Sequence, residues 1–248
     1  MTLPFDLTPL AVLWLALALF GAAYVRGYSG FGFAALAVSS ASLVTNPMHF
    51  VPVVILADVV LTAQQARGIR LDVDWRRVAT LFGGAFFGVP LGVWVLAGFG
   101  ADTARIVISL FVLAMCGLLL AGWRMAGRAG RGAHVGVGLV SGLANGAAVG
   151  GLPVAVFFAA QPVSAATFRA TLIAYFTLLD LWSLPMMGRA GFITRDTWLV
   201  TALALPILSL GVWLGGRHFF RAEPQSFRRF AILLLAVLAG FALLKSWV

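Results

Sequence analysis

Long uncharged stretches alternate with short basic clusters along the whole chain. A stretch of about 20 apolar residues is long enough to cross the hydrocarbon core of a bilayer as a helix. The two longest runs exceed one crossing, and Pro47, Pro52, Pro153 and Pro162 inside them mark points where a helix is expected to break. The pattern therefore predicts ten apolar segments. They are drawn from the uncharged runs 7–25, 27–57, 78–101, 106–123, 132–168, 197–216 and 230–244, and from the stretches 51–66 and 170–188, which each contain one carboxylate.

The composition also indicates an all-α integral membrane protein. Hydrophobic residues make up 62% and charged residues 10% of the 248 residues, whereas a soluble domain averages about half and about a quarter. The 17 Lys and Arg outnumber the 8 Asp and Glu, but they fall between the apolar runs, which is typical of membrane orientation and lipid contact and not of nucleic-acid binding. Cys116 is the single cysteine, so no disulfide, metal site or cofactor is expected.

The second half of the chain resembles the first at one ungapped offset of 119 residues, held over about 85 residues. Five segments in each half would enter the membrane from opposite sides, as in inverted-repeat transporters. The expected units are a first repeat over 1–123, a basic cytoplasmic linker over 124–132 and a second repeat over 133–248. The matches at this offset are Gly27 with Gly146, Gly32 with Gly151, Gly92-Val93-Trp94 with Gly211-Val212-Trp213, and Phe111 with Phe230.

The distribution of basic residues tests this topology. With five segments per half, 13 of the 17 Lys and Arg lie on one face, which the positive-inside rule makes cytoplasmic. If the second segment of each half did not cross, the split would be 10 against 7. We therefore expect a multi-pass protein of the cytoplasmic membrane with both termini outside. A re-entrant hairpin of the first two segments in each half gives the same count, so 8 to 10 crossings remain possible.

Two glycine-rich turns are the densest local signal. The first holds Ser29, Gly30, Phe31 and Gly32, and the second holds Asn145, Gly150 and Gly151. Glycines that open a helix expose its unpaired N-terminal amides, which attract an anion together with the helix dipole. Two such turns facing each other would form an anion-binding site. The alternative is close helix packing, for which small residues are also common.

Asp58 and Asp180 carry the highest free-energy cost of membrane insertion in the chain, because each lies near the middle of an apolar segment. The offset carries Asp58 to Thr177, one helical turn before Asp180. A carboxylate beside an anion repels it unless a proton is bound, so we expect at least one of them to couple protons to transport. The alternative is a neutral carboxyl that ties helices together, through Gln64 or Ser183.

Polar residues near these segments are further candidates for substrate contact. Arg26 precedes the first glycine turn, and its guanidinium suits an anion that offers several oxygens to a planar fork. It reaches mid-membrane if the first two segments form a hairpin, and lies at the cytoplasmic surface if they cross. The other candidates are Arg169, Gln64, Gln65 and Tyr175, whereas His49 is expected to cap or pack.

Three motifs together resemble the sulfite exporter TauE/SafE family of membrane permeases: the glycine-rich turn after the first helix, the stretch Val73 to Arg77 and the turn Gly150 to Pro153. The first turn departs from the family pattern, since Gly30-Phe31-Gly32-Phe33 stands where members often carry consecutive glycines and a proline. The resemblance implies secondary transport of small sulfur-containing anions such as sulfite, sulfoacetate or related sulfonates, and no enzymatic activity. The oligomeric state stays open, a dimer included.

Two other functions fit parts of the sequence. Gly27-Tyr28-Ser29-Gly30 matches the Gly-x-Ser-Gly pattern of rhomboid proteases, and His134 could serve Ser29 as a base. However, the glycine spacing after His134 does not match, and an inverted duplication gives a protease no advantage. A passive anion channel is the milder alternative, because the same turns could conduct without coupling.

Overall fold

The computed structural model describes residues 4–69, 71–122, 124–125, 127, 129–219, 232–233, 236–237, 239–240 and 243–244. Within these residues the chain is helical and contains no strand. A short 3-10 turn (Pro4–Asp6) precedes the helices. They are α1 (Pro9–Ser29), α2 (Phe33–Ala41), α3 (Pro47–Ile69), α4 (Trp75–Ala97), α5 (Ala101–Ala121), α6 (Arg131–Asn145), α7 (Gly151–Ala159), α8 (Ala165–Arg189) and α9 (Arg195–Phe219). The predicted last segment, 230–244, lies mostly outside the described residues.

Six of these helices are long and apolar enough to cross a membrane: α1, α3, α4, α5, α8 and α9. In contrast, α2 and α7 have nine residues each and span about 13 Å, less than half of a core about 30 Å thick. One of the four expected proline breaks is wrong, because Pro52 lies inside α3. Pro47 begins α3, Pro153 lies in the first turn of α7 and Pro162 lies between α7 and α8, so these three lie at helix boundaries. Proline is accommodated in a first turn since the amides there have no partner within the helix.

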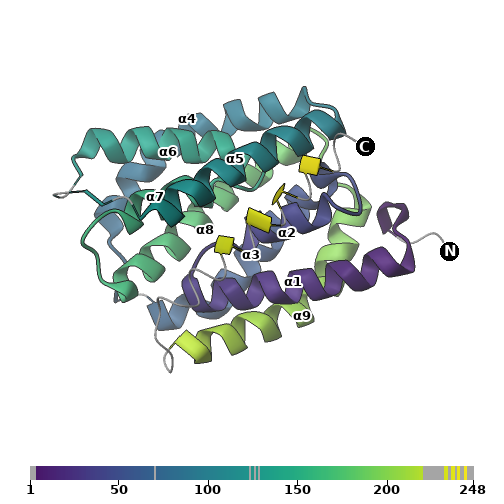
Figure 1. Ribbon diagram of the computed structural model, residues 1–248, viewed down its shortest axis with the longest axis horizontal. Helices are drawn as coiled ribbons and strands as arrows, with labels where there is room; N and C mark the ends of the chain where they lie inside the picture. Colours follow the sequence, from purple (N-terminus) through teal and green to yellow (C-terminus); the bar gives the residue numbers. More distant parts are fainter. Residues whose placement is uncertain are drawn as a thin grey trace.

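The helices form two outer groups around a central pair (Figure 1). α4 and α6 pack together on one side, α1 and α9 pack together on the other, and α3 and α8 lie between them, while α5 contacts α7 and α3. The Asp74 amide donates to Thr171 Oγ1 and the Trp182 indole donates to the Phe86 carbonyl, so α4 and α8 run in the same direction. Glycine contacts show that α6 also runs with α4, and that α1 runs with α9. The short loops that join consecutive helices then orient α3, α5 and α9 opposite to α4, α6 and α8.

Glycine stripes bring the paired outer helices into backbone contact. A Cβ atom added at Gly84, Gly88 or Gly92 of α4 would overlap the carbonyl oxygens of Val135, Leu139 and Leu143 of α6, respectively. The same relation joins α1 and α9, where a Cβ at Gly215 would overlap the carbonyl of Tyr24. Small residues are the usual means of close helix packing in a bilayer, where the hydrophobic effect does not drive association between helices.

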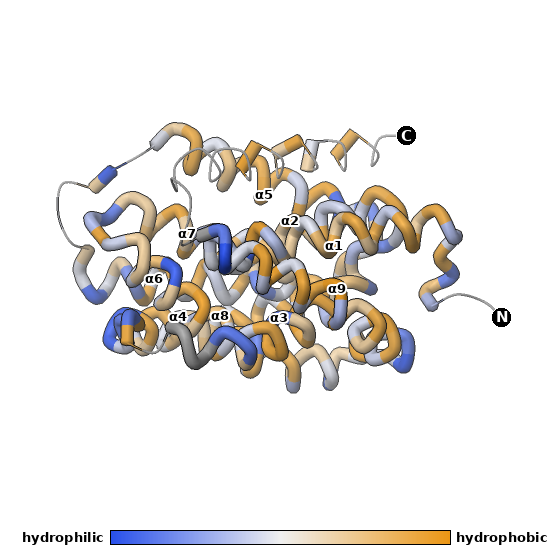
Figure 2. The backbone as a smooth tube through the Cα atoms, turned by 90° about the horizontal axis from the view of Figure 1, so that it is seen from below, coloured by the Kyte–Doolittle hydropathy of each residue, from blue (hydrophilic) through white to orange (hydrophobic). Residues whose placement is uncertain are grey.

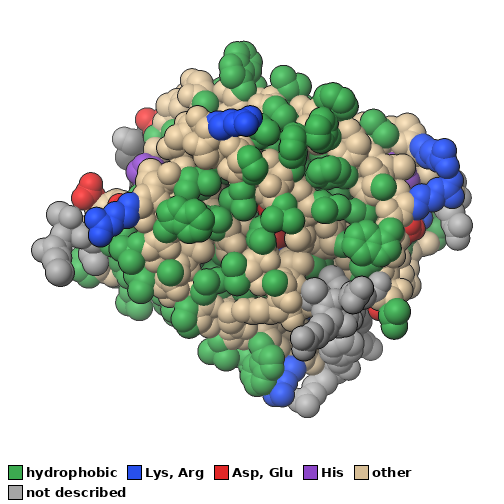
Figure 3. Space-filling model, turned by 180° about the vertical axis from the view of Figure 1, so that it is seen from behind, with side chains coloured by type: hydrophobic (Ala, Val, Ile, Leu, Met, Phe, Trp, Pro, Cys, Tyr) green, Lys and Arg blue, Asp and Glu red, His purple; other side chains and the backbone are tan. Residues whose placement is uncertain are grey.

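The outer surface is apolar along the helices and charged mainly at their ends (Figures 2 and 3). Phe87 and Trp94 of α4 are 67% and 75% exposed. Soluble proteins rarely expose apolar surface so widely. Basic residues at the starts of α4 and α6 and at the end of α9 share one end of the bundle; they include Arg76, Arg77, Arg131 and Arg217. The chain is therefore an α-helical multi-pass membrane protein.

Candidate functional site: a polar cavity between α3 and α8

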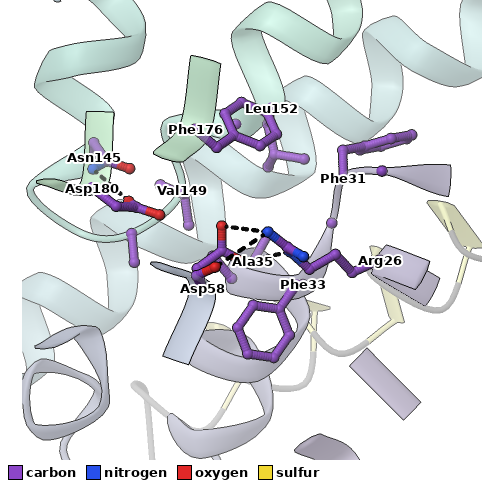
Figure 4. A pocket seen from close by; sticks show the side chains of 15 residues that line it. Arg26, Phe31, Phe33, Ala35, Asp58, Asn145, Val149, Leu152, Phe176 and Asp180 are labelled. Carbon is purple, nitrogen blue, oxygen red and sulfur yellow. Dashed lines mark hydrogen bonds and ion pairs between the residues drawn. The ribbon is translucent and has the colours of Figure 1, made fainter. Parts of the chain in front are cut away.

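A small cavity lies where the two short helices begin, beside the middle of α3 and α8 (Figure 4). Its volume is about 30 Å³, measured as the space open to the centre of a water molecule. Eight of the fourteen residues predicted for the site line it. They are Arg26, Gly30, Phe31, Gly32, Asp58, Asn145, Gly151 and Asp180.

Glycine is required at the first turn by the backbone conformation. Gly30 and Gly32 adopt φ angles of 81° and 90°, the left-handed region that other residues rarely occupy. A Cβ at Gly30 would also lie 2.8 Å from Cγ of Arg169. Gly32 caps the start of α2 without a side-chain hydrogen bond, so the first amides of α2 remain available at the cavity wall.

The second turn opens the other short helix at the same cavity. Ala148 has a φ of 56°, and α7 begins at Gly151 directly after Gly150, again without a side-chain cap. Ala148, Val149, Gly151 and Leu152 line the cavity. The positive ends of the α2 and α7 dipoles therefore meet at one place.

Arg26 is fully enclosed by polar partners from α3. Its side chain is 1% exposed, and its Nε lies 2.5 Å from Oδ1 of Asp58. Its Nη2 donates to Asp58 Oδ2 at 3.0 Å and to Thr62 Oγ1 at 2.6 Å, and its Nη1 donates to Gln65 Oε1 at 2.7 Å. The surface-anchor alternative for Arg26 is therefore wrong, because the guanidinium is buried in an ion pair.

The second half places an amide and a carboxyl at the matching position. Nδ2 of Asn145, the offset partner of Arg26, lies 3.4 Å from Oδ1 of Asp180 and donates to Ser183 Oγ at 2.9 Å. The Asp180 carboxyl is buried and lines the same cavity as the Asp58 carboxyl. Two carboxyl groups, one guanidinium and one amide thus converge on the cavity from α1, α3, α6 and α8.

Six predicted residues lie outside the cavity lining. Ser29 donates to the carbonyls of Val25 and Phe31 and shapes the turn. Gly150 lies against Ser141 and Asn145. Gln64 faces away from Arg26 and binds Ser209 Oγ of α9 at 2.9 Å, so its neighbour Gln65 is the residue that contacts Arg26.

Tyr175 and Arg169 support the cavity from behind. The Tyr175 hydroxyl donates to Ser141 Oγ at 2.9 Å, and that hydroxyl donates to the Gly150 carbonyl at 2.6 Å. Nη2 of Arg169 donates to the Gly27 carbonyl at 2.8 Å, which joins α8 to the end of α1. Both side chains fix the glycine turns.

Sequence reasoning missed the apolar part of the lining. Phe33, Ala35, Val149, Leu152 and Phe176 also line the cavity. Phe33 and Leu152 are close in sequence to the glycine turns, which could have pointed to them. Phe176 lies one helical turn before Asp180 on the same face of α8, so its spacing from that predicted carboxyl could have pointed to it.

The protease alternative finds no support in this geometry. The Ser29 hydroxyl is directed at backbone carbonyls, whereas His134 Nδ1 lies 2.9 Å from the Gly130 carbonyl and its ring packs on Phe157. The residues that the structure describes also contain no group of three or more His, Cys, Asp or Glu placed to hold a metal ion.

Comparison with known proteins gives a family over nearly the whole chain. The family model "Sulfite exporter TauE/SafE" matches residues 15–242. The chain is 28% identical to the probable sulfite/organosulfonate exporter TauE of Cupriavidus necator, over 93% of this chain and 94% of that protein. It is also 28% identical to the probable inner membrane transporter protein TsaS of Comamonas testosteroni, over 69% and 73% of the two chains. No solved structure matches the chain. The extent of the family match, on a helical membrane fold, shows that this chain belongs to the sulfite exporter TauE/SafE family of membrane transporters.

Proposed function

We propose that this protein is a secondary transporter that moves small sulfur-containing anions, such as sulfite, sulfoacetate or related organosulfonates, across the cytoplasmic membrane. One observation carries the proposal: the buried guanidinium of Arg26 lies in the same cavity as the N-termini of α2 and α7. An oxyanion there accepts charge-assisted hydrogen bonds from the forked guanidinium, and further hydrogen bonds from the unpaired amides at the two helix N-termini. The name of the Cupriavidus necator relative and that of the family supply the substrate class.

Asp58 and Asp180 support coupling to protons. Asp58 forms an ion pair with the guanidinium that the anion must bind, and Asp180 adds a second carboxyl near that ion pair. Two carboxyl groups that share one buried cavity repel each other when both are ionised, so at least one of them favours the protonated form. A further proton neutralises the remaining carboxylate and releases Arg26 to the substrate. Anion and proton are therefore bound together, and the loaded site carries no more charge than the empty one.

Two inverted repeats explain how the site reaches both sides of the membrane. We assign the first repeat to 1–123, the linker to 124–132 and the second repeat to 133–248. The offset equates α1 to α4 with α6 to α9, and the directions of the helices support it because the long helices of each equated pair run oppositely. Each half also supplies one carboxyl and its polar partner, Asp58 with Arg26 and Asp180 with Asn145. Rocking of one half against the other would give alternating access to a fixed central site.

The orientation follows from the positive-inside rule. The end of the bundle that holds the starts of α4 and α6 is the basic one and is assigned to the cytoplasm. The N-terminus then lies outside, as does the C-terminus if the last segment crosses. This agrees with the prediction from the distribution of basic residues along the chain.

The test is flux into proteoliposomes under an imposed pH gradient. Purified protein is reconstituted in vesicles that contain a pH dye, and sulfite, sulfate, methanesulfonate, sulfoacetate, taurine and a cation control are each added under anaerobic conditions. Coupled transport predicts proton movement in the direction of the anion, and accelerated exchange when unlabelled anion is present on the far side. A channel would show anion flux without that acceleration, and a response confined to zwitterions or cations would overturn the anion assignment.

A further inference from the structure

The cavity has a polar side and an apolar side. Arg26 and Asp58 lie on one side, and Phe176 and Leu152 lie across from them (Figure 4). A bare oxyanion gains nothing from an apolar wall, because every one of its oxygens seeks a donor. A sulfonate directs its oxygens to one side and its organic group to the other, which matches the two sides of this cavity.

The free volume limits how large that organic group can be. About 30 Å³ is open to water centres, which leaves room for only a few water molecules. Sulfite and methanesulfonate, with four and five non-hydrogen atoms, are substrates of this small size. Each added carbon extends the organic group further toward the apolar wall.

Phe176 is the wall residue placed to set this limit. It lies one helical turn before Asp180 on the same face of α8, so a substrate that reaches the carboxyl also meets the ring. The ring cannot retreat toward α7, because a Cβ atom at Gly151 would already lie 3.0 Å from its Cζ. Phe176 is also the only aromatic residue that α8 contributes to the lining described for this cavity.

We propose that Phe176 is a specificity-determining residue that restricts the substrate to sulfur oxyanions with an organic group of about one or two carbons. This inference rests on the proposed function, since it concerns the same cavity. Its mechanism is steric: the ring closes the end of the cavity opposite Arg26. Shortening the side chain therefore extends the range of substrates, an effect that damage to the fold cannot produce.

The experiment compares Phe176→Leu and Phe176→Ala with the unchanged protein against a homologous series. Inhibition of labelled sulfite exchange in proteoliposomes is measured with methane-, ethane-, propane- and butanesulfonate. In the unchanged protein, we expect the affinity to fall about tenfold from ethane- to butanesulfonate, as overpacking costs this much or more. In Phe176→Ala, the affinity should instead rise, by up to about fourfold per methylene group. Phe176→Leu should fall between the two and keeps the test available if the alanine variant folds poorly.

Phe87→Ala is the matched control, because Phe87 is 67% exposed on the outer face of α4. This variant should show the same dependence of affinity on the alkyl chain length of the sulfonate as the unchanged protein. An identical profile in the unchanged protein and both Phe176 variants would overturn the role of Phe176 while leaving anion transport intact. If the unchanged protein responds neither to sulfite nor to any member of the series, the proposed function itself fails.

Discussion

Replacing Arg26 with glutamine separates the structural role of its ion pair from its role in transport. The substitution leaves the Asp58 carboxylate buried without the cation that lies 2.5 Å away. Breaking a buried pair by removing one partner costs about 3–5 kcal/mol. At about 2–4 °C per kcal/mol for a chain of this size, the unfolding temperature of Arg26→Gln should fall on the order of 10 °C.

The double variant Arg26→Gln/Asp58→Asn removes both charges and leaves amides that can hydrogen-bond to each other. Most of the lost stability should return, because no uncompensated charge remains in the cavity. Transport should not return, since the guanidinium is the ligand of the anion in the proposed mechanism. The assay pairs thermal unfolding of the purified protein in detergent with sulfite exchange in proteoliposomes.

Two results would refute this reasoning. Equal destabilisation in the single and double variants would show that the ion pair does not determine the stability of the site. Exchange at the original rate in the double variant would show that Arg26 does not bind the anion.

Three further predictions address coupling, packing and the protease alternative. Asp58→Asn should retain anion exchange but lose its acceleration by a proton gradient, measured with the pH dye, because the coupling proton binds the carboxylate that pairs with Arg26; unchanged proton movement would contradict the coupling role. Gly88→Ala should sharply reduce the yield of folded protein on size-exclusion chromatography, because its Cβ overlaps the Leu139 carbonyl, whereas Gly136→Ala on α6, with open space around it, should be neutral or stabilised by up to about 1 kcal/mol. Ser29→Ala should leave fluorophosphonate labelling as low as in the unchanged protein; labelling lost only in this variant would favour an enzyme.

The sequence predicted the site best at positions where a residue type is energetically unfavourable or sterically required in its surroundings. Asp58 and Asp180 stand out because a carboxylate inside an apolar segment requires a reason, and the structure brings both to one cavity. The glycine turns stand out for the same kind of reason, since φ angles near 80–90° at Gly30 and Gly32 exclude most other residues. These signals are local and do not depend on knowing the packing.

The rotation and length of apolar helices could not be predicted in the same way. Gln64 and Gln65 differ by about 100° around α3, and only the packing shows that Gln65 faces Arg26 while Gln64 faces α9. Phe176 stands out only by its spacing from Asp180, because α8 is apolar on several faces. The nine-residue length of α2 is likewise invisible, because the uncharged run continues past its end at Ala41.

The most direct test of the account is the charge and proton movement caused by a sulfite or methanesulfonate jump on proteoliposomes adsorbed to a solid-supported membrane, at two pH values. The account predicts a response to both anions that grows toward acidic pH, is absent in Arg26→Gln/Asp58→Asn, and is accompanied by proton entry. Anion flux that is independent of pH and insensitive to these substitutions would contradict a proton-coupled site at Arg26, Asp58 and Asp180.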